Sequence, residues 1–225
     1  MDPAGGKATS GMMAVVTASP SGRVRTALAR HSKLATSMAV IVAGFIAYGV
    51  ATASPLALPY GVIIVGGALL AAAVEPEEGF SQLVLAGLAL WAVGHVAGGT
   101  VGLDGDRTLY NAVLRGRVHF DNLVHLVGFG TAGLAWWEAS RSWLLPRPGH
   151  GLAVVVVAVW LAGMGIGALN EVLEFIATLV LPETNVGGYR NTGRDLIANL
   201  LGAGMAGIVA ARRERKGELG TTVCG

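Results

Sequence analysis

Hydrophobic residues form six long runs, and short segments between the runs hold most of the charges. Each run has about 20 residues, the length at which an α-helix crosses roughly 30 Å of hydrocarbon. The runs are unbroken instead of alternating, and an open sheet cannot pair its backbone groups in lipid, so no strands are expected within them. The pattern predicts an all-α, polytopic transmembrane bundle of about six spans, at residues 34–53, 56–74, 80–98, 119–138, 152–181 and 192–211.

The composition agrees with a lipid environment. Only 13% of the 225 residues are charged and 53% are hydrophobic, whereas a soluble domain carries about 25% charged residues. The chain also has 34 glycines, and small residues let helices approach closely in a bilayer. Gly163 and Gly167 form a Gly-x-x-x-Gly pair, which we expect within ~4 Å of another helix.

The remaining sequence divides into two terminal segments around the spans. Residues 1–33 are rich in small and polar residues and end in basic ones, so they are predicted to be a disordered basic arm. Residues 34–211 form the six-span domain, and residues 212–225 form a basic tail. A cleaved signal peptide is the alternative for the first run, since Ala51–Ala53 resembles a cleavage site. The length of the run and of its leader favours a retained span.

Lysines and arginines near the span ends predict the orientation. The arm, the turn with Arg141 and Arg147, and the tail are all basic, which predicts that they lie in the cytoplasm together with both termini. Trp136 and Trp137 would then belong to an aromatic belt at the inner interface.

The connecting segments offer no recognisable chemical site. The acidic turn at Glu75–Glu78 is interpreted as solvated, and His31 as a cytoplasmic residue without a role. Cys224 is the only cysteine, which excludes an intrachain disulfide or a cysteine-based metal site. The net charge of +2 argues against a nucleic-acid partner, so membrane lipids are the expected surroundings.

Polar residues within the spans gather at one depth. Four runs bring them to the outer third of the membrane under this topology. An ionisable group near a helix centre costs at least ~2.5 kcal/mol, so such groups are expected to face one another or a wet cavity. The predicted polar cluster, as candidate catalytic residues, is Asp121, His125, Glu171, Glu174 and Asp195. Candidate binding residues around it are His95, His119, Asn170, Arg190, Arg194 and Asn199.

The spacing within the cluster supports a shared site. Asp121 and His125 are four residues apart and therefore share a helix face, and Asn170 and Glu174 repeat the spacing. Neighbouring carboxylates in a low dielectric can supply a general acid, and histidine with carboxylates can hold a divalent metal. Whether a metal binds stays open.

Structural interpretations stay open beside the chemical ones. Glu171 and Glu174 could pair with Arg190 or Arg194 and so lock the helices together. His119 at a span entrance fits an interfacial residue, while a lone histidine on an apolar face, such as His95, fits a hydrogen-bonded structural role.

Several of these segments resemble a known family. The matching segments are His95–Gly99, Leu109–Asn111, His119–His125, Asn170–Phe175 and Asn191–Ala203. Together they resemble YjdF-type inner-membrane proteins over about residues 90–205, and also the wider VanZ-like group, which is associated with glycopeptide (teicoplanin) tolerance. The resemblance implies a multi-pass protein of the bacterial cytoplasmic membrane with a role in the cell envelope, and no agreed reaction. Related sequences often carry an aspartate at Asn191, so a second carboxylate there is missing.

Two functions follow from these observations. One is a binding or accessory protein whose cluster is structural or recognises a lipid head group, favoured because no nucleophile or complete metal set is evident. The other is a membrane-embedded hydrolase or transferase, metal-assisted or acid–base, acting on a lipid-linked envelope substrate. Transport is less favoured because no inverted repeat is evident. Partners could be the lipids, such a substrate or another membrane protein.

In the enzyme, His125 and Asp121 would serve as base and orienting group or as metal ligands. Glu171 or Glu174 would be the acid, and the cationic side chains of Arg190 and Arg194 would hold an anionic head group.

Overall fold

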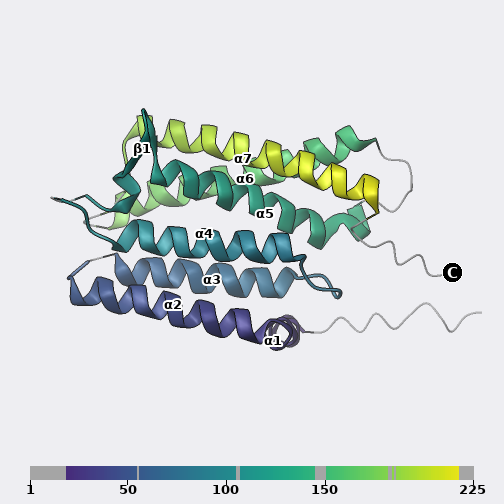
Figure 1. The fold of residues 1–225 in the computed structure, drawn as a ribbon, viewed down its shortest axis with the longest axis horizontal. Coiled ribbons are helices and arrows are strands. Elements are labelled where there is room, and N and C mark those ends of the chain that lie inside the picture. Colours follow the sequence, from purple (N-terminus) through teal and green to yellow (C-terminus); the bar gives the residue numbers. More distant parts are fainter. Residues whose placement is uncertain are drawn as a thin grey trace, which may run out of the picture.

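The computed structural model describes residues 19–54, 56–104, 107–144, 151–181, 184 and 186–217, apart from the side chains of residues 142–144. This part of the chain is an α-helical bundle, as predicted, with a short hairpin at one end (Figure 1). Its elements are α1 Pro20–Arg30, α2 Ser32–Ala51, α3 Ala57–Val74, α4 Gln82–Thr100, η1 Leu109–Asn111, β1 Val113–Arg115, β2 Val118–His119, α5 Phe120–Leu144, α6 Leu152–Val180 and α7 Tyr189–Lys216.

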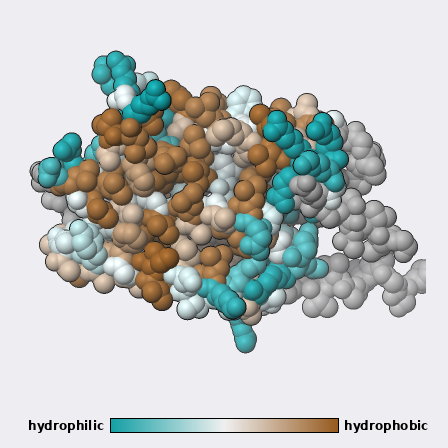
Figure 2. Space-filling view, viewed as in Figure 1, coloured by the Kyte–Doolittle hydropathy of each residue, from teal (hydrophilic) through white to brown (hydrophobic). Residues whose placement is uncertain are grey.

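Five helices are long and apolar enough to cross a membrane: α2, α3, α4, α6 and α7. They coincide with five of the six predicted spans. The sixth, α5, has 25 residues and runs alongside them, but it carries Asp121, His125, Glu138 and Arg141 and is therefore more polar (Figure 1). The molecular surface has a broad apolar band between hydrophilic ends, as expected for a protein in a bilayer (Figure 2).

Helices α5, α6 and α7 pack closely through glycine. A Cβ added at Gly163 would meet Ala203 Cβ and Phe129 O at 2.7 Å, and one at Gly167 would meet the Asn199 side chain at 2.6 Å. The predicted Gly-x-x-x-Gly contact is therefore confirmed, and it joins α6 to both α5 and α7. Gly165, between the two, has nothing within 4 Å of its added Cβ and lies on the open face.

Helix α1 corrects the prediction of a disordered arm for residues 20–33. It lies across the end of the bundle and is seen almost end-on in Figure 1. Its first turn is capped by Ser19, whose hydroxyl accepts from Gly22 N at 3.2 Å. Arg23 and Arg30 donate to backbone carbonyls of the turn between α3 and α4, at 3.0 Å to Glu75 O and 3.3 Å to Pro76 O. These acceptors, which a sequence does not display, hold α1 in place; residues 1–18 lie outside the described part.

Two smaller expectations were also wrong. Glu75 is buried instead of solvated, because its carboxylate bonds to His31, to Arg30 and to the backbone of Phe80. Trp137 is 1% exposed instead of interfacial, and its indole donates to Glu214 Oε1 at 3.0 Å. The loop after α4 contains the β1–β2 hairpin, which forms outside the spans where water can pair the strand edges. Arg147 and Cys224 lie outside the described residues.

Candidate functional site

His125 lies at the centre of the polar cluster and comes from the second turn of α5. Its Nε2 is 3.6 Å from Asp121 Oδ1, on the same helix, and 3.8 Å from Glu174 Oε1 on α6. Its Nδ1 is 3.5 Å from Glu171 Oε1 and 3.3 Å from Asn199 Oδ1 on α7. Three helices therefore converge on one imidazole, at the end of the bundle opposite α1.

The hydrogen bond to Asn199 indicates which nitrogen of His125 carries the proton. Asn199 Oδ1 can only accept, so Nδ1–H is the donor, and the lone pair is then on Nε2. That lone pair faces Asp121 and Glu174. A histidine that binds a metal usually has this arrangement, in which the other ring nitrogen donates to an oxygen.

Asp195 is the best-satisfied carboxylate of the cluster. It is fully buried at the start of α7, and it accepts from Asn122 at 2.8 Å and from Asn191 at 2.6 Å. Asn191 also donates to Asp121 Oδ2, at 3.0 Å. The amide of Asn191 thus bridges Asp121 and Asp195. An aspartate, which related sequences often carry at this position, would repel both carboxylates.

Glu171 is the opposite case. It is 8% exposed, and neither of its carboxylate oxygens has a hydrogen-bond partner among the described residues. Burying a charged group without a partner costs free energy, so a bound ion or ligand that contacts these oxygens would stabilise the site. Glu171, Glu174 and His125 offer ligand atoms within 4.8 Å of one another, and Asp121, His125 and Asp195 do so as well.

Arginine forms no ion pair with this cluster in the described part of the chain. No ion pair there joins Arg190 or Arg194 to Glu171 or Glu174, so the predicted structural lock is wrong for these residues. Arg190 is exposed and Arg194 is half-buried, one residue before Asp195. Four carboxylates and one histidine therefore meet inside the bundle without a paired guanidinium.

A cavity of about 320 Å³ opens beside the cluster. Asp121, His125, Asn170 and Glu174 form part of its wall. The rest comprises mainly apolar side chains of α3 and α6, which flank the opening: Leu56, Pro59, Ile63, Leu173, Ala177 and Leu181. Ile63 and Leu173 are 49% and 56% exposed on apolar helices, so the cavity opens sideways toward lipid.

His95 and Tyr110 form the deep wall of this cavity. The hydroxyl of Tyr110 is 2.7 Å from His95 Nδ1 and 2.9 Å from His95 O. Burial raises the pKa of Tyr110 well above its ordinary value, so the hydroxyl keeps its proton. Both contacts are satisfied when Nδ1–H donates to the hydroxyl and the hydroxyl donates to the carbonyl. His95 is therefore hydrogen-bonded, in agreement with its structural interpretation, and it also lines the cavity.

A comparison with family models identifies the chain. Residues 33–216 match a family described as predicted membrane protein (DUF2238). The chain belongs to the DUF2238 family. No curated protein and no solved structure matches it.

The DUF2238 match covers all six long helices and the whole polar cluster. It establishes a membrane protein family; it does not establish the narrower YjdF-type or VanZ-like likeness. Within this DUF2238 protein, the five predicted catalytic candidates lie together, and Asn170 and Asn199 join them through Glu174 and His125. Their chemical roles stay predictions.

The remaining binding candidates of the DUF2238 chain lie farther out. His119 is half-buried where β2 meets α5; it pairs with Val113 of β1, and its backbone N–H donates to Asn122 Oδ1 at 2.9 Å. Asn122 and Tyr110 were not predicted for the site. The position of Asn122, one residue after Asp121 in a helix first turn, was the signal that could have found it. Tyr110 comes from a loop, and no spacing rule connects it with His95.

Proposed function

We propose that this DUF2238 protein holds a divalent metal ion at His125, Glu171 and Glu174, and hydrolyses the polar part of a lipid-linked substrate. The observation that carries the proposal is the buried carboxylate of Glu171, which lies 3.5 Å from His125 Nδ1 and has no hydrogen-bond partner within the described part of the chain. A divalent cation would give these oxygens a partner.

The charge of the cluster supports a cation. Asp121, Glu171, Glu174 and Asp195 are carboxylates, and the described arginines do not pair with them. Gathering negative charge in a low dielectric is costly unless a positive charge compensates it. Nitrogen from one histidine and oxygen from carboxylates suit zinc, manganese or iron better than calcium.

Each neighbour of the ion would have a separate role. Asn199 holds the ring of His125 so that Nε2 faces the cavity. Asn170 orients Glu174 through a 2.7 Å hydrogen bond. Asp121 lies on the cavity wall and would take the proton of an attacking water molecule, whose oxygen bonds to the reacting centre while the head-group bond breaks. The leaving group takes up a proton from the site.

The side opening supports a substrate with an apolar chain. A lipid-linked molecule could place its chain between α3 and α6 and its head group on the cluster without leaving the membrane. Arg190 and Arg194 begin α7 near Asp195 and would contact an anionic head group.

The proposal includes location and orientation. The basic helix α1 and the basic end of α7 lie at the same end of the bundle (Figure 1), which supports both termini in the cytoplasm and the cluster at the outer face of a bacterial inner membrane. The resemblance to YjdF-type and VanZ-like proteins supports a role in the cell envelope. Reporter fusions after residues 33 and 225 should both indicate cytoplasm; an external C-terminal reporter would contradict the orientation.

The decisive experiment measures metal and turnover in the same preparations. Purified protein should contain about one ion per chain by mass spectrometry, and the variants His125→Ala and Glu171→Gln should lose it. Incubation with a bacterial lipid extract should release a water-soluble product, detected by mass spectrometry, and a chelator should stop the release.

Asp104→Asn is the matched control, because Asp104 lies in an exposed loop and belongs to neither group of candidate metal ligands. It should keep both metal and turnover. Metal content that is equal in the parent and in folded His125→Ala protein would contradict the metal site.

A non-catalytic role is the second candidate. The complete hydrogen bonding of Asp195 by Asn122 and Asn191 favours it, because such networks also serve to lock helices. Metal binding without release of any product from the lipid extract would favour a lipid-binding or accessory role over the enzyme.

A further inference from the structure

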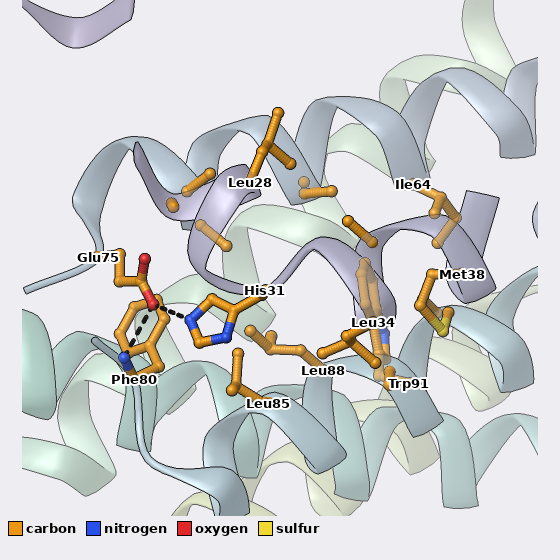
Figure 3. A pocket seen from close by; sticks show the side chains of 18 residues that line it. Leu28, His31, Leu34, Met38, Ile64, Glu75, Phe80, Leu85, Leu88 and Trp91 are labelled. Carbon is orange, nitrogen blue, oxygen red and sulfur yellow. Dashed lines mark hydrogen bonds and ion pairs between the residues drawn. The ribbon is translucent and has the colours of Figure 1, made fainter. Parts of the chain in front are cut away.

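A second cavity lies at the opposite end of the bundle, separate from the His125 cluster. It has a volume of about 180 Å³ and lies among α1, α2, α3 and α4 (Figure 3). Its described lining is apolar except for His31 and Glu75 at one end. Trp91 and Ile64 mark its inner end, near the middle of the bundle.

Small side chains on α3 create this space. Gly67, Ala68, Ala71 and Ala72 line the cavity on one face of the helix, where larger residues would fill it. Protein interiors are close-packed, and voids larger than a water molecule are few. An apolar space that opens toward lipid would be filled by an apolar chain instead of water.

The polar end of the cavity is built from charged groups. His31 Nε2 is 2.6 Å from Glu75 Oε1 (Figure 3). Arg30 Nη1 is 3.4 Å from Glu75 Oε2, so both carboxylate oxygens are engaged. The segment above it, from α1 to the first turn of α2, carries four cations and no acidic residue: Arg23, Arg25, Arg30 and Lys33. Lys33 is exposed, one residue before Leu34 of the lining. The facing turn carries Glu75, Glu77 and Glu78, so four cations lie opposite three carboxylates and the entrance keeps an excess of one positive charge.

The length of the cavity matches one leaflet. On α3 the lining runs from Ile64 to Glu75, which at 1.5 Å per residue is about 16 Å. Half the hydrocarbon thickness of a bilayer is about 15 Å. An acyl chain anchored at the surface would therefore reach Trp91 with its terminal part.

We propose that this cavity binds one acyl chain of an anionic phospholipid, whose phosphate lies against Lys33. The apolar lining recognises the chain, and the basic entrance selects the anionic head group over a zwitterionic one. The bound lipid would fill the space beneath α1 and tie this surface helix to the membrane. The site is independent of the metal centre proposed above.

Fluorescence of Trp91 provides the test, since bromine atoms on an acyl chain quench a neighbouring indole. The full chain is placed in vesicles of phosphatidylcholine containing a small fraction of brominated phosphatidylglycerol or brominated phosphatidylcholine. The Trp91 signal is the difference between the parent and Trp91→Phe. Quenching should need about fivefold less brominated phosphatidylglycerol than brominated phosphatidylcholine, as expected for one cation at the surface.

Two variants probe the two halves of the site. Ala35→Leu with Ala71→Leu fills the cavity and should remove the quenching by phosphatidylglycerol; Ala43→Leu, exposed on the same α2 helix and outside the cavity, should keep it. In Lys33→Gln, brominated phosphatidylglycerol and brominated phosphatidylcholine should quench Trp91 at nearly equal fractions. As a measurement that does not depend on tryptophan, native mass spectrometry should find fewer retained phosphatidylglycerol molecules on the filled variant than on the parent.

Equal quenching by both lipids in the parent would overturn the head-group selection and show ordinary surrounding lipid. Unchanged quenching and lipid retention in the filled variant would overturn the cavity as the binding site.

Discussion

The two halves of this bundle differ in how they use small residues. In the α5–α6–α7 half, glycines bring backbones together, so that a Cβ added at Gly202 would collide with the Leu126 carbonyl. In the α1–α3 half, Gly49 and Gly61 also bring α2 and α3 together, but farther along α3 the small residues that line the cavity leave open space. The first half encloses four carboxylates and a histidine, whereas the second encloses mainly alkyl groups.

The difference follows from what each half holds. Hydrogen bonds require donor and acceptor within about 3 Å, so a polar cluster needs helices that approach closely and keep their register. Apolar contacts are not directional, and lipid chains can replace protein side chains at small cost. Close packing therefore accompanies the polar site, and looser packing is tolerated where the neighbours are apolar.

The largest expected loss of stability comes from adding a large side chain in the closely packed α5–α6–α7 half. Gly163→Leu should lower the free energy of unfolding by about 3 kcal/mol, because its side chain meets Ala203 and the Phe129 carbonyl. The melting temperature in detergent measures the loss. Gly165→Leu, two residues away on the open face, is the control and should melt like the parent. Equal melting of both variants would mean that this face of α6 is not packed.

Removing a buried donor should have the next largest effect. Asn122→Leu leaves Asp195 Oδ1 without its 2.8 Å partner at a fully buried position, which should cost about 1–3 kcal/mol. Asn170→Leu removes the donor of Glu174, but Glu174 faces the cavity, where water can replace it. Denaturation in mixed micelles should therefore separate the two variants. Similar losses would show that the cavity does not hydrate Glu174.

A smaller and local effect is expected at the other end. Glu75→Gln weakens the charged contacts to His31 and Arg30, so hydrogen exchange of α1 should become about tenfold faster, equivalent to ~1.4 kcal/mol. Glu77→Gln is the control, because Arg30 bonds to the Glu77 backbone carbonyl and not to its carboxylate. Unchanged exchange in Glu75→Gln would show that the backbone contacts alone hold α1.

The smallest change in stability is expected from filling the cavity in the α1–α3 half. Ala35→Leu and Ala71→Leu should each change the free energy of unfolding by less than about 1 kcal/mol, since the added side chain enters existing space. The matched substitution in the α5–α6–α7 half is Ala203→Leu. Ala203 has no exposed surface and lies beside Gly163, so this substitution should lower the free energy of unfolding much more. If all three melt alike, the two halves do not differ in packing.

Much of the fold could be predicted because lipid imposes a simple rule. Unbroken apolar runs located α2, α3, α4 and α6 to within a few residues. The convergence of Asp121, His125 and Glu174 also followed from local information, since their depth and helix face depend on position along the helix. The contribution of Asn122 could not be predicted, because its partner Asp195 is 73 residues away.

The docking of helix α1 is a second feature that could not be predicted from the sequence. Its sequence is basic and polar, and no local pattern indicates that Arg23 and Arg30 find acceptors on the turn after α3. The burial of Glu75 has the same cause, because its partners His31 and Arg30 come from a segment more than 40 residues earlier.

By itself, the sequence determined that this protein is a membrane helical bundle and that Asp121, His125, Glu171, Glu174 and Asp195 lie near one end of it, because hydropathy and helical period are properties of neighbouring residues. Only the tertiary structure decided which carboxylate is satisfied and which is not. Asp195 has two amide donors, whereas Glu171 has no hydrogen-bond partner among the described residues, although both are buried acids beside the same histidine. That difference depends on how three helices are rotated against one another, and glycine contacts between their backbones set the rotation.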